Sequence, residues 1–330
     1  MTVRITRRRA ITVLGAAAGL PLLMRAGGAR AQLARWEGTT LGAPSTIQLY
    51  HHDETAAHAA IQDGLKELAR LEAIFSVYRA DSALSTLNRG GVLTNPPAEL
   101  VELLSQALNL AAASDGVYDP TVQPVWQTYF RHFTAAHPDP DGPPRRELDS
   151  ALALVGWRNV EVSSARIAFA RPGMGLTLNS GAQGYITDRV VAVLRGHGFE
   201  KMLVDMGEPR ALSTKPDGSA WRIGIANPAD PSKAVTEIDV VDRCVSTSGG
   251  YGTLFDDAGR FTHIIDTRTG ATAPALQSVS VVAETATRAD GLSTAMLMVA
   301  PERRQDLLRA TGAEMAIYVA PDGVIATVRT

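Results

Sequence analysis

The first third of the chain carries apolar residues at three- and four-residue steps, the period of an amphipathic helix. This pattern predicts a long helix that Asp53 caps and that runs to about Tyr78. Its apolar positions are Ile61, Leu65, Leu68, Leu71, Ile74 and Phe75. Further helices are expected in a short segment that ends near 88, at 96–113, around 190–194 and at 303–310.

Beyond residue 159 the apolar residues recur at every second position, which is typical of strands. Residues 32–44 are polar and are expected to form a lead-in without regular structure. Strands are expected at 46–50, 159–163, 166–170, 175–179, 201–205, 221–225, 238–245 and 277–283, and a closing hairpin at 315–319 and 324–328. Long helices first and strands later favour an α+β fold, with mixed or antiparallel sheets and packed helices.

The N-terminus has the three parts of an export signal. Paired arginines at 7–9 precede a short apolar run from Ala10 to Leu23, and Ala29-Arg30-Ala31 fits a small-residue cleavage site. Arginines before a mild apolar run indicate the twin-arginine route. We therefore expect a signal peptide at 1–31, a single domain at 32–330 and a location in the periplasm, with no integral membrane segment after the signal.

Charge and cysteine content exclude several classes of protein. Six of the 32 basic residues and none of the 34 acidic residues lie in 1–31, so residues 32–330 carry a formal net charge of −8. An acidic chain with 5% aromatic residues does not indicate nucleic-acid binding. The single cysteine, Cys244, excludes an internal disulfide and is expected to be a buried, inert thiol.

Candidate chemistry is concentrated between Ser246 and Thr294, which contains hydroxyls, glycines, His263 and the carboxylates Asp266, Glu284 and Asp290. Asp290 and Thr294 are four apart, so on a helix they share one face and could hold a hard cation. From spacing alone, which is a weak pattern, the favoured interpretation is that Asp290 is a first-turn acid stabilised by the helix dipole and that Thr294 is ordinary helix surface.

Two earlier segments also leave alternatives open. Pro120 forces Asp119 into an extended conformation, where an aspartate is often only a turn former or helix cap. The small residues at 179–184 precede a helix and could bring backbone amides to a phosphate, or form only a tight structural turn.

Seven motifs in order resemble those of the ApbE family, the FAD:protein FMN transferases. The resemblance extends from about Leu41 to the last strand. Its motifs are Leu41-Gly42, Phe75-Ser76-Val77-Tyr78 with Asp81-Ser82 and Leu87-Asn88, Gly116 to Thr121, Leu178 to Asp188, Thr247-Ser248-Gly249, His263 to Asp266 with Thr269-Gly270, and Asp290 to Thr294.

The resemblance implies an ApbE-like, T-fold-related architecture and an enzyme that uses FAD as substrate with Mg²⁺ or Mn²⁺. It would transfer FMN to a Thr or Ser hydroxyl of a periplasm-facing flavoprotein, form a phosphoester and release AMP. The implied metal ligands are Asp290, Thr294 and the Ser180 carbonyl, and His263 would accept the hydroxyl proton. The implied FAD site comprises Leu41, Tyr78, Val117, Tyr118, Asp119, Thr177, Gln183 and Ile264.

The chain departs from the family pattern at four places. Thr177 replaces an aspartate, Gln183 replaces a common lysine, Asn179-Ser180 replaces a glycine pair, and Leu41-Gly42-Ala43 replaces Met-Gly-Thr. The missing lysine removes one positive charge near the phosphates. Two alternatives therefore stay open: a periplasmic FAD-binding or carrier protein without transfer, and an FAD pyrophosphatase that yields FMN and AMP.

Overall fold

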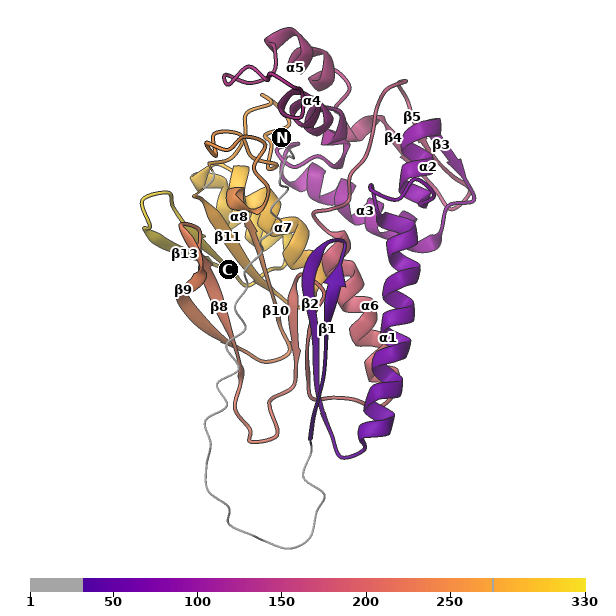
Figure 1. Ribbon diagram of the computed structural model, residues 1–330, viewed down its shortest axis with the longest axis vertical. Coiled ribbons are helices and arrows are strands. Elements are labelled where there is room, and N and C mark those ends of the chain that lie inside the picture. The colour runs from indigo at the N-terminus through magenta and orange to yellow at the C-terminus, as the bar shows by residue number, and fades with distance from the viewer. Residues whose placement is uncertain (1–31, 275) are drawn as a thin grey trace, which may run out of the picture.

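A computed structural model describes residues 32–274 and 276–330, and the expected signal peptide lies outside them. The fold centres on an eight-stranded antiparallel sheet (Figure 1), which confirms the α+β prediction. Its strand order is β1 (Gln32–Thr40), β2 (Ala43–His51), β6 (Met202–Asp205), β7 (Pro209–Leu212), β10 (Cys244–Gly249), β11 (Ser278–Ala283), β12 (Met315–Val319) and β13 (Ile325–Arg329).

Helices cover one face of this sheet. Helix α7 (Ala286–Met298) packs on β10 and β11, α6 (Ala182–Gly196) packs on α7, and α1 (Glu54–Phe75) packs on α6. The Asp53 side chain caps α1 by accepting from the Ala56 amide at 2.9 Å, as predicted. Helices α3 (Ala98–Ala113) and α8 (Arg304–Thr311) complete this layer.

A hairpin of β8 (Trp221–Asn227) and β9 (Asp230–Val240) contributes to an apolar cluster on the opposite face of the sheet. Alternate residues of the central strands serve the two layers, because successive side chains of a strand point to opposite faces. In β6, Val204 joins the helical core and Leu203 joins the hairpin cluster. In β10, Cys244 and Val245 divide in the same way.

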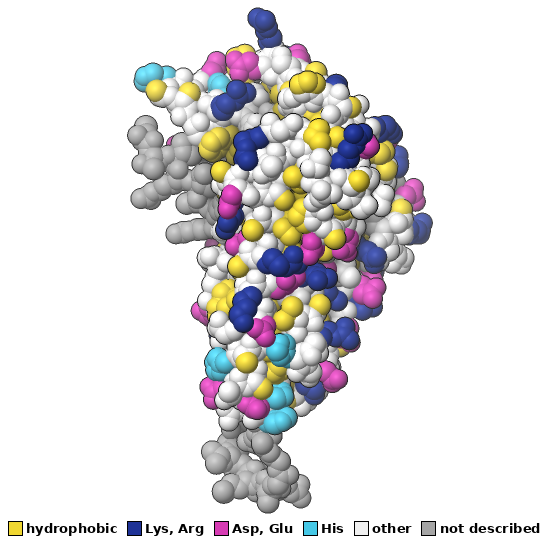
Figure 2. Space-filling model, turned by 90° about the vertical axis from the view of Figure 1, so that its right-hand side faces the viewer, with side chains coloured by type: hydrophobic (Ala, Val, Ile, Leu, Met, Phe, Trp, Pro, Cys, Tyr) yellow, Lys and Arg dark blue, Asp and Glu magenta, His cyan; other side chains and the backbone are white. Residues whose placement is uncertain are grey.

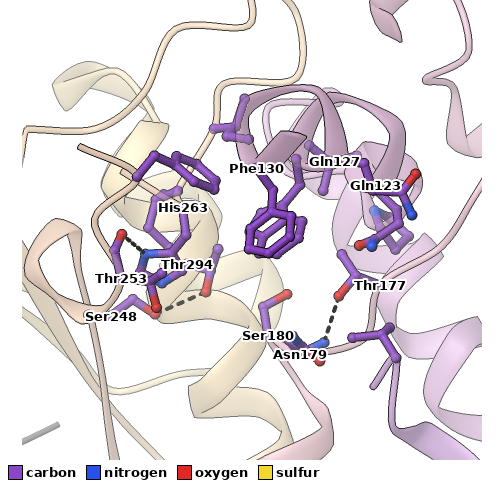
Figure 3. A pocket seen from close by; sticks show the side chains of 18 of the residues that line it. Gln123, Gln127, Phe130, Thr177, Asn179, Ser180, Ser248, Thr253, His263 and Thr294 are labelled. Carbon is purple, nitrogen blue, oxygen red and sulfur yellow. Dashed lines mark hydrogen bonds between the residues drawn. The ribbon is translucent and has the colours of Figure 1, made fainter. Parts of the chain in front are cut away.

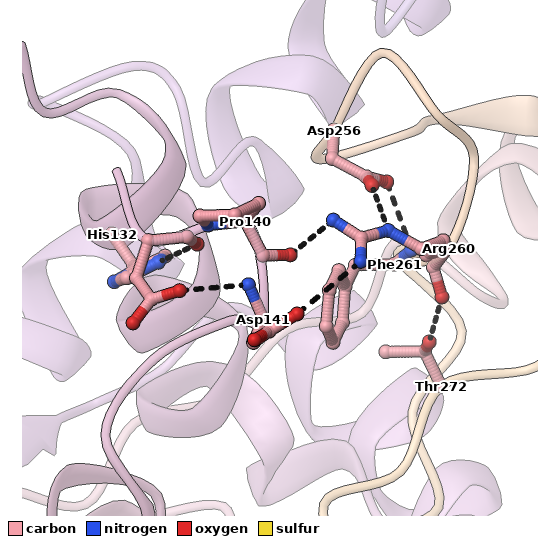
Figure 4. A network of polar contacts seen from close by, with 8 residues as sticks. His132, Pro140, Asp141, Asp256, Arg260, Phe261 and Thr272 are labelled. Carbon is pink, nitrogen blue, oxygen red and sulfur yellow. Dashed lines mark hydrogen bonds and ion pairs between the residues drawn. The ribbon is translucent and has the colours of Figure 1, made fainter. Parts of the chain in front are cut away.

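A roof, which we define as residues 120–152 and 250–274, lies over one end of the sheet. It contains α4 (Gln123–Phe133) and α5 (Arg145–Leu152). Arg260 ties its two segments together (Figure 4), since its guanidinium contacts the Pro140 carbonyl, Asp141 at 3.5 Å and Asp256 at 3.3 Å. Beside the roof lie α2 (Ala83–Gly90) and a small sheet of β3 (Val92–Thr94), β5 (Arg166–Phe169) and β4 (Val160–Val162).

The face shown in Figure 2 carries acidic and basic side chains intermixed rather than a continuous basic surface. Ion pairs contribute to this pattern: Arg70 contacts Glu67 at 2.8 Å and Glu99 at 2.6 Å. Within 32–274 and 276–330, no helix has both the length and the apolar character needed to cross a bilayer.

The predicted lead-in at 32–44 was wrong, because most of it is strand β1. The strand pairs with β2 along its whole length through a two-residue turn at Leu41 and Gly42. Both turn residues have positive φ, 47° and 83°, the combination that a tight hairpin requires. The non-glycine Leu41 concealed that turn in the sequence.

Two other strand predictions were also wrong. Residues 175–179 form no strand, because the Asn88 side-chain amide hydrogen-bonds both backbone groups of Leu176. It donates to the Leu176 carbonyl at 2.8 Å and accepts from the Leu176 amide at 2.7 Å. The single strand expected at 238–245 is the end of β9 and the start of β10. Between them Asp242 adopts a φ of 53° and accepts a hydrogen bond from the Ser213 amide, which makes a corner.

The N-terminal ends of α6 and α7 meet, and each helix supplies a carboxylate to the other. Asp188 of α6 accepts from the Ala286 and Thr287 amides, both at 2.9 Å, and Asp290 of α7 accepts from the Gly184 amide at 3.0 Å. Each carboxylate thereby satisfies helix-end donors and interacts favourably with the helix dipole. The helices approach so closely that a Cβ at Gly184 would overlap the Ala286 carbonyl and lie 2.8 Å from the Thr287 nitrogen.

We predict that Gly184→Ala lowers the free energy of unfolding by about 1–3 kcal/mol or more, because backbone atoms cannot move aside as a flexible side chain can. Urea unfolding of the full-length chain, followed by circular dichroism, measures the change. The control is Gly196→Ala in the same helix, where an added Cβ meets nothing within 4 Å and stability should stay the same or rise by up to about 1 kcal/mol. Equal effects of the two substitutions would contradict the close approach.

Candidate functional site

A cavity of about 530 Å³ lies between the roof and the meeting point of β10, α6 and α7 (Figure 3). Eleven of the twelve predicted site residues line it, although they come from segments far apart in the sequence. They are Leu41, Tyr78, Val117, Tyr118, Asp119, Thr177, Ser180, Gln183, His263, Ile264 and Thr294, with Asp290 as the one member of the predicted set that does not line it.

Asp290 lies directly behind the cavity wall and is 1% exposed. It is not the first-turn acid that its spacing allowed, because α7 begins at Ala286 and Asp290 is the fifth residue of the helix. One turn further on, Thr294 reaches the cavity. The anion that the structure places at the start of α6 is therefore the Asp290 carboxylate, held by the Gly184 amide, and not a phosphate at that amide.

The three predicted metal-binding groups belong to two segments that touch. A Cβ at Gly291, next to Asp290, would lie 3.3 Å from the Ser180 carbonyl oxygen, so the absence of a side chain lets this carbonyl approach α7. Carboxylate, hydroxyl and carbonyl oxygens are the hard ligands that Mg²⁺ and Mn²⁺ accept. Among residues 32–274 and 276–330 no group of three or more His, Cys, Asp or Glu could hold a metal, so a cation here would depend on this mixed oxygen set.

His263 is half-buried in the cavity wall, and its ring is fixed by the roof. Its Nδ1 lies 3.1 Å from the Thr253 carbonyl oxygen, which can only accept a hydrogen bond. In the neutral ring the proton is therefore on Nδ1, and the lone pair is on Nε2. This tautomer is the one that a general base acting through Nε2 requires.

Asp119 shows the capping role that the sequence left open. Its carboxylate accepts from the Thr121 amide at 2.8 Å, the Thr121 hydroxyl at 2.7 Å and the Trp157 amide at 2.8 Å. Burial raises the pKa of Asp119, while these hydrogen bonds oppose the rise. Asp119 also lines the cavity, so the capping role does not exclude contact with a ligand.

Two tyrosines place aromatic surface at different depths. Tyr78 is 55% exposed at the cavity mouth, whereas Tyr118 is buried and its hydroxyl accepts from the Ser180 hydroxyl at 3.2 Å. Burial raises the pKa of Tyr118, so its hydroxyl stays protonated at neutral pH. Both rings could pack against a planar heterocycle.

The amide of Gln183 occupies the place that the resemblance gives to a lysine. Its Nε2 donates to the Thr40 carbonyl at 3.3 Å, and a Cβ at Gly207 would lie only 2.6 Å from this nitrogen. Among the described residues that line the cavity there is no lysine or arginine. An anionic ligand would thus meet no permanently cationic side chain in the part of the wall that the structure describes.

Sequence reasoning missed the α4 wall and Ser248. Trp126, Phe130 and Phe133 point one face of α4 into the cavity (Figure 3 shows Phe130). Their spacing of four and three residues is a helical period that could have identified them. Ser248 had been identified only as part of a sequence motif, and its hydroxyl contacts the Thr294 hydroxyl at 2.9 Å.

The other groups singled out in the 246–294 stretch have structural surroundings. Asp266 pairs with Arg268 at 2.8 Å, Glu284 is exposed, and neither lines the cavity. Cys244 is buried, as predicted, and burial raises the pKa of its thiol. Asp188, whose role the sequence did not reveal, holds the helix junction and pairs with Arg210.

Comparisons with known proteins agree with this geometry. The ApbE family profile matches residues 41–319. The FAD:protein FMN transferase of Treponema pallidum is 31% identical, over 89% of this chain and 87% of its own length, and that of Salmonella typhimurium is 29% identical, over 86% and 83%. The apo crystal structure of the Pseudomonas stutzeri flavinyl transferase ApbE superposes with a TM-score of 0.77 at 29% identity, covering 91% of this chain and 95% of that one.

We predict that Asp119→Ala lowers the free energy of unfolding by about 1–3 kcal/mol, because it leaves buried donors without an acceptor. The control is Asp217→Ala, where an exposed aspartate makes the same local pair of bonds, to the amide and hydroxyl of Ser219. Because Asp217 is fully exposed, its loss should leave the free energy of unfolding close to that of the wild type. Urea unfolding of both variants decides the matter, and an Asp119→Ala protein as stable as wild type would show that the cap contributes nothing.

Proposed function

The chain belongs to the ApbE family and is an FAD:protein FMN transferase, and we propose that it works with Mg²⁺ and delivers FMN to a Thr or Ser hydroxyl of a target flavoprotein. The hydroxyl oxygen attacks the FMN phosphorus, the bond from that phosphorus to the bridging oxygen breaks, and AMP leaves with the bridging oxygen. The product is a phosphoester. The observation that carries this proposal is the presence in one cavity wall of Thr294, the Ser180 segment and His263.

His263 is the proposed acceptor of the hydroxyl proton. The Thr253 carbonyl supports this role by holding the proton on Nδ1, which leaves the lone pair on Nε2. Proton removal as the new phosphoester bond forms is general base catalysis, to which histidine is well suited near neutral pH.

Asp290, Thr294 and the Ser180 carbonyl are the proposed metal-binding groups. The Gly184 amide fixes one carboxylate oxygen of Asp290, as outer contacts commonly orient metal ligands. When bound, the ion would supply positive charge that offsets the negative charge developing on the leaving group. Mn²⁺ could replace Mg²⁺ at such an oxygen site.

FAD is the proposed occupant of the rest of the cavity. Tyr78 and Tyr118 offer aromatic surface, and Leu41, Val117 and Ile264 offer apolar surface beside them. Thr177, Gln183 and the Asp119 segment supply the polar part of this wall. With no lysine or arginine in the described lining, the metal carries most of the attraction for the pyrophosphate.

The N-terminal sequence supports a proposal about location. Arginines followed by an apolar run and a small-residue site at 29–31 favour export to the periplasm by the twin-arginine route. The acceptor would then be a flavoprotein domain that faces the periplasm.

We predict metal-dependent flavin transfer. The full-length chain is incubated with FAD, Mg²⁺ and a flavoprotein domain that bears a target threonine, and in-gel flavin fluorescence detects the product. EDTA should abolish the fluorescent acceptor band. Asp290→Asn, which keeps an oxygen for the Gly184 amide, should lower the rate on the order of 100-fold or more, whereas Asp306→Asn on the exposed side of α8 should not.

Other outcomes separate the competing functions. Free FMN and AMP formed without an acceptor would indicate a pyrophosphatase. FAD recovered intact with Mg²⁺ and two different acceptor domains would indicate a carrier. Full activity of Asp290→Asn would show that the metal assignment is wrong.

We also predict that Gln183→Lys makes FAD binding less dependent on metal. A lysine would restore a positive charge, and attraction of about 1 kcal/mol at short range corresponds to roughly fivefold tighter binding. Quenching of flavin fluorescence, measured in EDTA, gives the affinity. The control is Gln127→Lys, which adds the same charge on the α4 wall. Equal gains from both variants would show that total charge, rather than position 183, matters.

A further inference from the structure

A chain of hydroxyl groups runs from the helix layer to the cavity. Ser246 and Ser248 lie two apart on β10 and face α7, while Thr247 between them bonds Ser280 of the next strand. The Ser293 hydroxyl lies 3.3 Å from that of Ser246 and 2.7 Å from that of Ser248. The Ser248 hydroxyl in turn lies 2.9 Å from that of Thr294 (Figure 3).

One end of this chain has a fixed direction. The Ser293 hydroxyl lies 2.9 Å from the Asp290 backbone carbonyl, which has no proton to give, so Ser293 is the donor there. A hydroxyl carries a single proton and can accept through its lone pairs. Ser293 must therefore accept from Ser248, and Ser248, whose proton is then used, must accept from Thr294.

This order determines how Thr294 faces the cavity. Its proton points to Ser248, so the lone pairs of its oxygen remain for a ligand on the cavity side. In that orientation the Thr294 oxygen presents a lone pair to a cation on the cavity side. If the hydroxyl rotated, its proton would point at the ion instead. The direction of these hydrogen bonds is set by the backbone carbonyl of Asp290. The side-chain carboxylate of the same residue belongs to the proposed metal site.

We propose that Ser248 is a positioning residue that turns the Thr294 hydroxyl into a ligand for a divalent cation, with Ser293 fixing the direction of the bonds. The inference rests on the proposed function, since it concerns the same metal site. Ser248 acts through Thr294 rather than on the substrate. If these hydroxyl groups served only to stabilise the fold, the direction of their hydrogen bonds would have no effect on the affinity for the metal.

The test is a titration of the full-length chain with Mn²⁺ alone, in which electron paramagnetic resonance measures the free ion. Ser248→Ala should weaken Mn²⁺ binding about tenfold, the lower end of the usual effect of lost outer contacts. Ser246→Ala, at the far end of the chain of hydroxyls, should change it less than twofold. Ser293→Ala should also weaken binding, although Ser293 is fully buried and does not line the cavity.

A double variant distinguishes orientation from general damage. If Ser248 acts through Thr294, adding Ser248→Ala to Thr294→Val should cause no further loss of Mn²⁺ affinity. Additive losses, or wild-type affinity in Ser248→Ala, would overturn the inference. Urea unfolding checks that each variant is folded, and Ser293→Ala repeats the test at a second position if Ser248→Ala is unstable.

The same titration separates this inference from the proposed function. If Asp290→Asn and Thr294→Val both keep wild-type Mn²⁺ affinity, the metal site itself is wrong. If both weaken binding and Ser248→Ala does not, only the orienting role of Ser248 fails.

Discussion

The exchange of carboxylates between α6 and α7 is the interaction on which the site depends. Asp188 and Asp290 each satisfy amides at the start of the other helix, so neither helix can shift along the other without exposing buried donors and a buried charge. Gly184 allows the two backbones to meet. A junction held from both sides fixes the helix starts relative to each other and to β10 beneath them.

The proposed metal site follows from this junction. Ser180 lies two residues before the start of α6, and Asp290 and Thr294 are in the second and third turns of α7, so all three lie close to the place where the helices meet. The Gly184 amide that binds Asp290 belongs to the junction as well. The same contacts therefore stabilise the fold and orient the carboxylate of the proposed metal site. Stability and the proposed site are thus coupled more tightly than they would be for a ligand on a loop.

The sequence predicted much of this fold because its patterns were local. The α1 period, the Asp53 cap and the β12–β13 turn all depend on residues near one another in the chain. The missed β1–β2 hairpin is local and was concealed by the non-glycine Leu41 in its turn, but other failures involve partners far away in sequence. Residue 176 is held by Asn88, and the role of Asp188 is set by amides about a hundred residues later. Such long-range contacts leave no periodic pattern in the sequence. In the same way, Ser248 belonged to a recognised motif, but the motif did not show that Ser248 contacts Thr294.

The charges of the residues in and behind the cavity wall determine how a metal ion and a pyrophosphate would bind there. The described lining has Asp119 but no lysine or arginine, and Asp290 adds a second carboxylate just behind the wall. Such a site repels a bare pyrophosphate and attracts a divalent cation. With the proposed metal site, anion binding would then require the cation to be present, so the metal and the pyrophosphate would bind as interdependent ligands. A lysine at position 183 would weaken that dependence, and the neutral Gln183 would keep it strong. With the proposed metal site, the protein would thereby link recognition of FAD to binding of the ion.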